Sequence, residues 1–523
     1  MKVSVRLTSL AVAAALAAAA SAARAAERPL RLQDAISLAV ANDDRLAAER
    51  DLLRAAEASE SGAHGVYDPV LEFSGGWRHS TLPVFSSFSG APVGLLAPTI
   101  QAGTASADLR QLLPTGGSVA LRGSAERRTS DSTYDLFSPS YTTGVGIELR
   151  QPLLRDRAID AARVAVQVAG ADHASANADL HRELADTVAQ VEQTYWTLVA
   201  ARRQVEVREE AVRLAEEQRS ETDHRIRSGV APETEAAQPR AELERRRGEL
   251  LAAREAASRA ENALKLLVAA DDDAALWNDT LQPVEDAAPT VEPVDVSAAM
   301  EQALAGRPEL RARDAALERR RAERALAVDA VRPVLDLVAS YDRYGAAGTA
   351  RTLDATSRLR GNLGDSLDML GNGDLYDGRV GVVLAVPLTN RAARAGAEAA
   401  RSNESAAQAD LDRARKQVRS EVLDAAAARE TAGQRIEAAR AGRAAAEVQL
   451  DAERQRYGAG MSTNFLVLTR QNDLSSARLE EIAAQTDYRR AATEMARVTG
   501  TLLAARGVEE GTHGAKVSGG VNR

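Results

Sequence analysis

Cysteine is absent from this chain of 523 residues. Its absence excludes disulfide bonds, a lipid anchor on cysteine and metal sites built on thiolate. The six histidines show no metal-ligand spacing, and the chain lacks a phosphate-binding loop, a G-x-S-x-G motif and a dinucleotide fingerprint. Its many carboxylates lie on the flanks of helical heptads, where a solvated role is the common one. We therefore expect no enzyme, no cofactor and no bound metal.

Long apolar runs are missing after residue 26, so we expect no transmembrane helix. Residues 1–26 combine a basic start, an apolar stretch over 7–20 and an A-x-A match at 23–25, which predicts a cleaved secretory signal peptide. The alternative, a membrane-anchoring helix, is weakened because this apolar stretch is short. The net charge of −9 comes without a basic, aromatic-rich face, so nucleic-acid binding is not expected.

Two long helices are expected, because proline is absent from 157–227 and apolar residues there recur with the 3.5-residue period of a coiled coil. At about 1.5 Å per residue the first helix would be roughly 105 Å long. The second is expected over 392–457. Each ends in a glycine turn and returns as a helix over 233–268 or 464–502. The heptad residues are Leu184, Val188, Val191, Tyr195, Leu198, Val205 and Val212, and then Val418, Val422, Ala425, Ala432, Ile436, Ala439, Ala446 and Leu450.

The chain is an internal duplication, because the pattern of residues 35–46 recurs without a gap at 299–310. Each half reads as helix, strand, strand, long helix, turn and helix. The expected strands span about 68–79 and 142–151 in the first half, and about 333–342 and 379–387 in the second. The halves are 27–269 and 297–505, separated by an acidic, proline-rich connector over 270–296. A disordered tail is expected over 506–523.

The expected strands alternate apolar and polar residues, as transmembrane barrel strands do. Eleven of the seventeen aromatic residues fall in 67–141 and 341–376, near strand ends and in long loops expected over 80–101 and 343–378. A soluble sandwich is the alternative, but the long helices leave no second sheet to cover an apolar face. The residues expected to face lipid are Leu71, Phe73, Trp77, Val145, Ile147, Leu149, Leu335, Leu337, Tyr341, Val380, Val382 and Leu384.

Four strands cannot close a barrel, whose smallest common form has about eight. Each unpaired backbone group in hydrocarbon costs several kcal/mol, so an edge of ten residues would cost roughly tens. The strands must therefore be shared among chains, in a dimer or a larger oligomer. A further hairpin is expected over 104–126, around the turn at 114–117. It either joins the barrel or lies beside it.

The duplication, the sequence Gln151-Pro152-Leu153-Leu154 before the long helix and the turns at Gly229 and Gly460 together resemble the TolC family of outer-membrane efflux proteins. The resemblance implies a mainly α chain with a membrane β-barrel: a homotrimer with a twelve-stranded barrel and a twelve-helix periplasmic tunnel. It implies docking with a periplasmic adaptor protein and an inner-membrane pump, in the outer membrane of a Gram-negative bacterium. The chain would export small molecules or proteins in a tripartite efflux or type I secretion system.

A periplasmic coiled-coil adaptor or scaffold that never enters the membrane is the rival interpretation. It explains the long helices but leaves the alternating strand pairs unexplained.

In the TolC family the channel narrows at the periplasmic end, just after the glycine turns. Aspartates often follow the second turn by six and nine residues, whereas this chain has Leu466 and Thr469 there. The acidic position after the first turn is kept as Glu235. The resemblance thus implies a partly apolar gate. Its candidate residues are Glu235, Phe465, Leu466 and Thr469, although helix packing alone could explain Phe465 and Leu466. The candidate adaptor-docking residues are Gly229, Val230, Gly460 and Met461.

Overall fold

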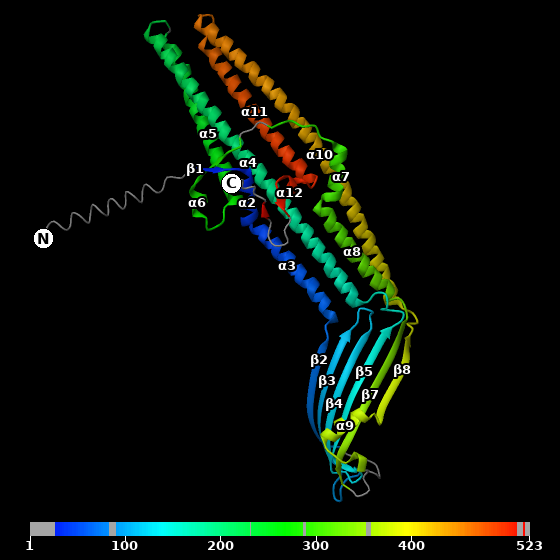
Figure 1. The fold of residues 1–523 in the computed structure, drawn as a ribbon. Coiled ribbons are helices and arrows are strands. Elements are labelled where there is room, and N and C mark those ends of the chain that lie inside the picture. The colour runs from blue at the N-terminus through cyan, green and yellow to red at the C-terminus, as the bar shows by residue number, and fades with distance from the viewer. Residues whose placement is uncertain are drawn as a thin grey trace, which may run out of the picture. The chain divides into compact units, whose positions relative to one another are not determined.

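The computed structural model describes residues 27–82, 90–230, 232–285, 289–351, 357–509 and 516–517 (Figure 1). The chain divides into two compact units. The first comprises residues 1–53, 176–313 and 411–523, and the second comprises 54–175 and 314–410. No helix of the described residues is both long and apolar enough to span a membrane.

The duplication is visible in the spacing of the elements. The first helices and strands of the two halves start at one constant offset, and both helix pairs break at one residue, Asp43 in the first half and Arg307 in the second. The equivalent elements are α2 (Leu32–Asn42) and α7 (Val296–Gly306), α3 (Asp44–His64) and α8 (Pro308–Asp329), and β2 (Val70–Thr81) and β7 (Val334–Ala350).

The second unit contains one antiparallel sheet of six strands, in the order β2-β3-β4-β5-β7-β8 (Figure 1). The first half therefore contributes four strands and the second half two, which resolves the alternative left open for the hairpin. The hairpin expected over 104–126 lies in the sheet, between β2 and β5. Its strands are rich in alanine, serine and glycine, so their sequence signal was weak. The strands not yet placed are β3 (Thr99–Leu112), β4 (Ser118–Ser130), β5 (Phe137–Pro152) and β8 (Leu375–Ala385).

The loops expected at the strand tips are shorter than predicted. Strand β3 begins within the first, at Thr99, and β7 continues into the second as far as Ala350. The second loop also contains helix α9 (Leu363–Asn372), whose first turn is closed by a capping box of Asn362 and Asp365.

Four helices of the second unit lie in a row, in the order α3, α4, α8 and α10 (Figure 1). Three side-chain pairs, on neighbouring helices, hold the row: His173–Glu60 at 2.6 Å, Arg319–Asp172 at 2.9 Å and Arg324–Glu404 at 2.9 Å. The long helices α4 (Ala161–Arg227) and α10 (Arg391–Gly458) continue into the first unit.

Helix α4 begins four residues later than predicted. Asp156 has a positive φ of 63°, and its backbone N–H donates to Asp329 Oδ2 at 2.6 Å. This contact turns the chain between β5 and the helix.

The main apolar core of the first unit forms around the heptad seam of α4. Val188, Val191, Tyr195 and Leu198 are fully buried there. The connector contributes α6 (Ala274–Asn278) and β6 (Thr280–Pro283), and β6 pairs in parallel with β1 (Glu27–Leu30).

The tail is ordered further than predicted. Arg506 forms an ion pair with Glu192, and Val508 is buried in the same core. The Arg506–Glu192 pair and the buried side chain of Val508 hold residues 506–508 against the helices.

The returning helices of the first unit are each interrupted once. A 3-10 turn, η2 (Glu233–Ala236), precedes α5 (Ala237–Val268), so Pro239 lies in the first turn of α5, where its missing N–H costs little. Helix α11 (Asn464–Val498) is followed by Gly500, with φ of 74°, and then by α12 (Leu502–Ala505).

Candidate functional site

The turns that reverse the two long helices have the same backbone geometry. Gly229 and Gly460 have φ of 73° and 76°. In each turn the next residue's N–H donates at 2.9 Å to a carbonyl five residues earlier, from Val230 to Arg225 and from Met461 to Arg456. This is a Schellman motif, which favours glycine at the left-handed position. Val230 is 67% exposed and Met461 is 75% exposed, so each turn presents one apolar side chain.

Side-chain contacts hold the two helix hairpins together near these turns. The Arg225 guanidinium carbon lies 4.9 Å from the centre of the Tyr457 ring, a cation–π geometry. Gln218 Nε2 donates to Asn464 Oδ1 at 2.6 Å. The two hairpins therefore contact each other close to their turns.

The four gate candidates fall into two groups. Phe465 and Thr469 line a cavity of about 220 Å³ between α5 and α11, together with Glu242 and Arg245. Leu466, 40% exposed, follows the capping residue Thr463 and does not line this cavity. Glu235 lies exposed in η2, also outside it. The structure thus brings two of the four candidates together.

The cavity between α5 and α11 has a charged side that sequence reasoning did not single out. Burial opposes ionisation of Glu242, but hydrogen bonds from Arg245 and Arg246 hold the pKa of its carboxyl below its ordinary value. Arg245 also donates to Asn472 Oδ1 of α11 at 2.9 Å. The helices are therefore joined by a polar clamp beside Phe465.

The register of the sheet places its apolar residues on one face. Residues paired directly across strands share a face, and Leu71, Leu109, Leu121, Ile147 and Tyr341 form one such row across five strands. Twelve residues predicted to contact lipid all lie on this face by the same rule: Leu71, Phe73, Trp77, Val145, Ile147, Leu149, Leu335, Leu337, Tyr341, Val380, Val382 and Leu384.

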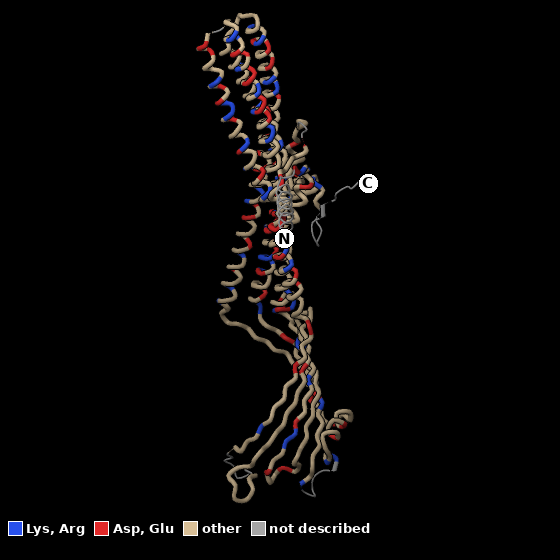
Figure 2. The backbone as a smooth tube through the Cα atoms, turned by 90° about the vertical axis from the view of Figure 1, so that its left-hand side faces the viewer, with Lys and Arg blue, Asp and Glu red and all other residues tan. Residues whose placement is uncertain are grey.

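By the same pairing rule, the opposite face carries most of the charged residues that Figure 2 marks along the strands. Arg122 lies 3.4 Å from Asp108 and 3.0 Å from Glu148 across two strand boundaries, and Arg150 lies 2.6 Å from Asp336. The charged residues of this face are Glu72, Arg78, Asp108, Arg110, Arg122, Glu126, Arg128, Glu148, Arg150, Asp336, Asp342, Asp377 and Arg379. The sheet is therefore apolar on one side and charged on the other.

Helix α9 packs on the apolar face at one end of the sheet. Thr143 Oγ1 donates to the Ser366 carbonyl at 2.9 Å, and both residues are buried. A Cβ atom on Gly345 would lie 1.8 Å from the same carbonyl oxygen, so glycine is required by this close approach. Leu363 and Leu367 remain exposed on the helix.

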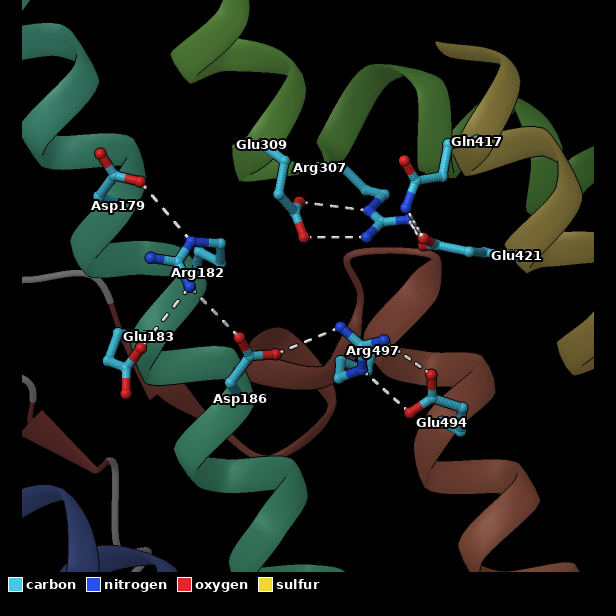
Figure 3. A network of polar contacts seen from close by, with 10 residues as sticks. All are labelled: Asp179, Arg182, Glu183, Asp186, Arg307, Glu309, Gln417, Glu421, Glu494 and Arg497. Carbon is cyan, nitrogen blue, oxygen red and sulfur yellow. Dashed lines mark hydrogen bonds and ion pairs between the residues drawn. The ribbon is translucent and has the colours of Figure 1, made fainter. Parts of the chain in front are cut away.

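Two clusters of ion pairs form a network of polar contacts in the first unit, one between α4 and α11 and the other between the α7–α8 corner and α10 (Figure 3). Arg497 contacts Asp186 at 3.2 Å and Glu494 at 2.7 Å. Arg307, only 5% exposed, pairs with Glu309 at 2.9 Å and with Glu421. Asp186, Glu309 and Arg497 also line a cavity of about 510 Å³. Sequence reasoning missed this network, because its members are far apart along the chain.

Comparison with known proteins agrees with this architecture. A sequence profile of the family described as "Outer membrane efflux protein" matches residues 100–270 and 299–501, which is more than half of the chain. In a search of curated proteins, no sequence matched.

Several solved structures share the fold, at identities too low to show more than that. The CmeC outer membrane channel of Campylobacter jejuni gives a TM-score of 0.60 at 16% identity, covering 90% of this chain and 86% of that one. The outer membrane protein VceC of Vibrio cholerae gives a TM-score of 0.60 at 16% identity, covering 90% of this chain and 96% of that one. The open state of the MtrE outer membrane channel from Neisseria gonorrhoeae gives a TM-score of 0.56 at 17% identity, covering 90% of this chain and 89% of that one.

Long paired helices joined to a sheet with one apolar and one charged face define an outer-membrane channel with a large periplasmic part. The chain belongs to the outer membrane efflux protein family. It is therefore an exit duct for export across the outer membrane of a Gram-negative bacterium, and the rival interpretation as a soluble adaptor has no support.

Proposed function

We propose that this duct is a homotrimer whose sheets together form the membrane barrel. The observation that carries the proposal is the sheet, which is two-faced and has open edges. Neither β2 nor β8 has a second neighbour among the described residues. Because an unpaired edge in hydrocarbon costs roughly tens of kcal/mol, the edges must pair with other copies. The twelve apolar-face residues then contact lipid, and the charged face lines water.

The paired helix turns of the first unit bind a periplasmic adaptor protein, which connects the duct to an inner-membrane pump. Gly229 and Gly460 fix the shape of the docking surface, and Val230 and Met461 supply its apolar contacts. The exposure of both side chains and the identical turns support this role. The pump selects the cargo, either small molecules or proteins.

The closed gate lies just after these turns and is partly apolar. Phe465 and Leu466 are both exposed in the single chain, 59% and 40% respectively, although large apolar residues tend to be buried. In the trimer they face the channel axis with Thr469, and Glu235 supplies an acidic rim. Because Leu466 replaces the acidic residue common in the TolC family, we expect only weak block by divalent cations.

Membrane fractionation and export assays test the proposed trimer and docking. We expect heat-modifiable trimers in the outer-membrane fraction and restored drug efflux in a host that lacks its own duct but expresses the matching adaptor and pump. Val230→Glu should abolish efflux and leave the trimer intact, with Leu423→Glu on α10 as an exposed control. A soluble monomer in the periplasmic fraction would refute the proposal.

A further inference from the structure

We propose that three copies close a barrel of eighteen strands, with β8 of one copy paired to β2 of the next. This inference rests on the proposed homotrimer and adds the width of its outer-membrane opening. Six strands per chain, all antiparallel to their neighbours, give eighteen in a trimer. The even number leaves β2 and β8 running in opposite directions, so the seam between copies is also antiparallel.

The additional strands are an insertion into the first half of the duplication. Strands β2 and β7 begin at Val70 and Val334, and the long helices that follow them begin at Ala161 and Arg391. The interval from first strand to long helix is therefore longer in the first half than in the second. The excess closely matches the length of segment 99–130, which forms β3, β4 and their turn. These elements have no counterpart among the described residues between β7 and β8.

The inserted hairpin is an integral part of the sheet. Strand β3 pairs with β2 over twelve residues, and β4 pairs with β5 over eleven, without register shifts. Its apolar and charged residues also continue the two faces: Leu109 and Leu121 extend the apolar row, while Asp108 and Arg122 extend the charged one. A hairpin outside the barrel would interrupt both rows.

The six-stranded sheet is about as wide as the row of four helices. Four helices with axes about 10 Å apart occupy roughly 40 Å. Six strands, spaced about 4.8 Å and tilted about 40°, occupy roughly 38 Å of a circumference, whereas four would occupy about 25 Å. Strands β2, β5, β7 and β8 follow the same order as α3, α4, α8 and α10, to which they connect. The hairpin widens the sheet between β2 and β5 to match.

Closing eighteen strands gives a backbone diameter of about 36 Å, against about 24 Å for twelve. The cross-section of the opening thus roughly doubles before side chains are counted. Each chain contributes six arginines and seven carboxylates to the charged face, so the charges nearly balance. The opening then selects by size rather than by charge, and it admits large polar solutes that a twelve-stranded opening excludes.

Paired cysteines test the strand order, and the chain has no cysteine of its own to interfere. Within one copy, Ser74→Cys with Ser106→Cys joins β2 to β3, where the two hydroxyls are 2.8 Å apart. Ser124→Cys with Gly144→Cys joins β4 to β5. Between copies, Val383→Cys is combined in turn with Glu72→Cys, Ser74→Cys and Gly76→Cys. Val383→Cys with Ser124→Cys, a position inside the sheet, is the control that should not link copies.

We expect both internal disulfides, and covalent trimers from at least one seam pair. Trimers that lack the internal disulfides would show a twelve-stranded barrel with the hairpin outside, and would overturn the inference while leaving the trimeric duct. Linked dimers without trimers would overturn it too, because two copies supply only twelve strands. Loss of outer-membrane trimers in the parent protein would instead refute the proposed function.

Polymer exclusion in planar bilayers measures the opening itself. Polyethylene glycols added only to the extracellular side enter the barrel without passing the gate. The parent protein should admit polymers about one and a half times wider than those admitted by a variant lacking residues 99–130. Equal cut-offs in two correctly assembled trimers would contradict a wider opening. If the variant lacking residues 99–130 fails to assemble, the cysteine cross-links decide whether the hairpin belongs to the barrel.

Discussion

Asp43 and Arg307 occupy the same position in the two halves of the duplication, yet they carry opposite charges. Each stands at the break between paired helices, and each binds the long helix of its own half. Asp43 Oδ2 accepts from Thr187 Oγ1 of α4 at 3.0 Å, and Arg307 donates to Glu421 of α10. In both halves the residue at the helix break is bound to the long helix, but by an acceptor in the first half and by a donor in the second. The two residues therefore cannot replace each other.

Removing the buried arginine should weaken the first unit. Arg307→Ala removes the guanidinium that pairs with Glu309 and Glu421, and we expect a loss of about 2 kcal/mol in stability. The thermal midpoint of the purified trimer, followed by circular dichroism, measures the effect. Arg324→Ala, which breaks a more exposed pair with Glu404, should cost below about 1 kcal/mol. Equal effects of the two variants would contradict a special role for Arg307.

Lowering the pH should break the contact between Arg307 and Glu309. Burial opposes ionisation of Glu309, but the hydrogen bond from Arg307 holds the pKa of its carboxyl below the ordinary 4.5. Because the folded pKa is lowered, this stabilisation is complete above about 4.5 and is lost as the pH falls through the folded value. The difference in thermal midpoint between the parent and Glu309→Gln should therefore be largest at neutral pH and vanish in strong acid. A constant difference would count against the contact.

Removing an apolar side chain should open the proposed gate, without any change of charge. Leu466→Ser removes an apolar side chain from the proposed constriction, so single-channel conductance in planar bilayers should rise severalfold. Leu423→Ser changes a leucine of α10 that is more exposed than Leu466 and lies well before the turn, and it should leave conductance unchanged. If Leu466→Ser retains the conductance of the closed parent, Leu466 is a packing residue only.

Two strand glycines offer a matched test of α9. Gly345→Ala forces a methyl group against the Ser366 carbonyl and should displace the helix, at a cost of about 1–3 kcal/mol. Gly381→Ala in the adjacent strand meets nothing within 4 Å and should change stability by less than about 0.5 kcal/mol. Limited proteolysis around residues 363–372 should become faster in the first variant only. Unchanged cleavage would mean that α9 is not held by this contact.

Sequence predicted the elements that repeat. The long helices show a sustained heptad period, the turns contain glycine, and the constant offset between the halves ties both to one pattern. For such features the local sequence pattern and the tertiary packing favour the same structure, so a single sequence is enough to predict them. The twelve apolar-face positions were also found in this way, from an alternation along four strands that only a few positions, such as Val338 and Val383, interrupt.

The errors arose where local signals were weak or contacts were distant. The sequences of β3 and β4, with many alanines and serines, left their place in the sheet open until the pairing was known. Val508 follows a glycine in a stretch typical of disorder, and its burial and the Arg506–Glu192 pair hold it beside α4. The Arg307–Glu421 pair joins residues 114 positions apart, which no periodicity reveals.

The hairpin of β3 and β4 changes how this kind of molecule can vary. A pair of strands is the smallest addition that preserves the direction of every later strand, and here it carries no helix with it. The circumference in the membrane is thereby uncoupled from the number of helices that meet the adaptor. Evolution can therefore widen the opening for larger solutes without changing the helices that meet the adaptor, and so without changing the pump.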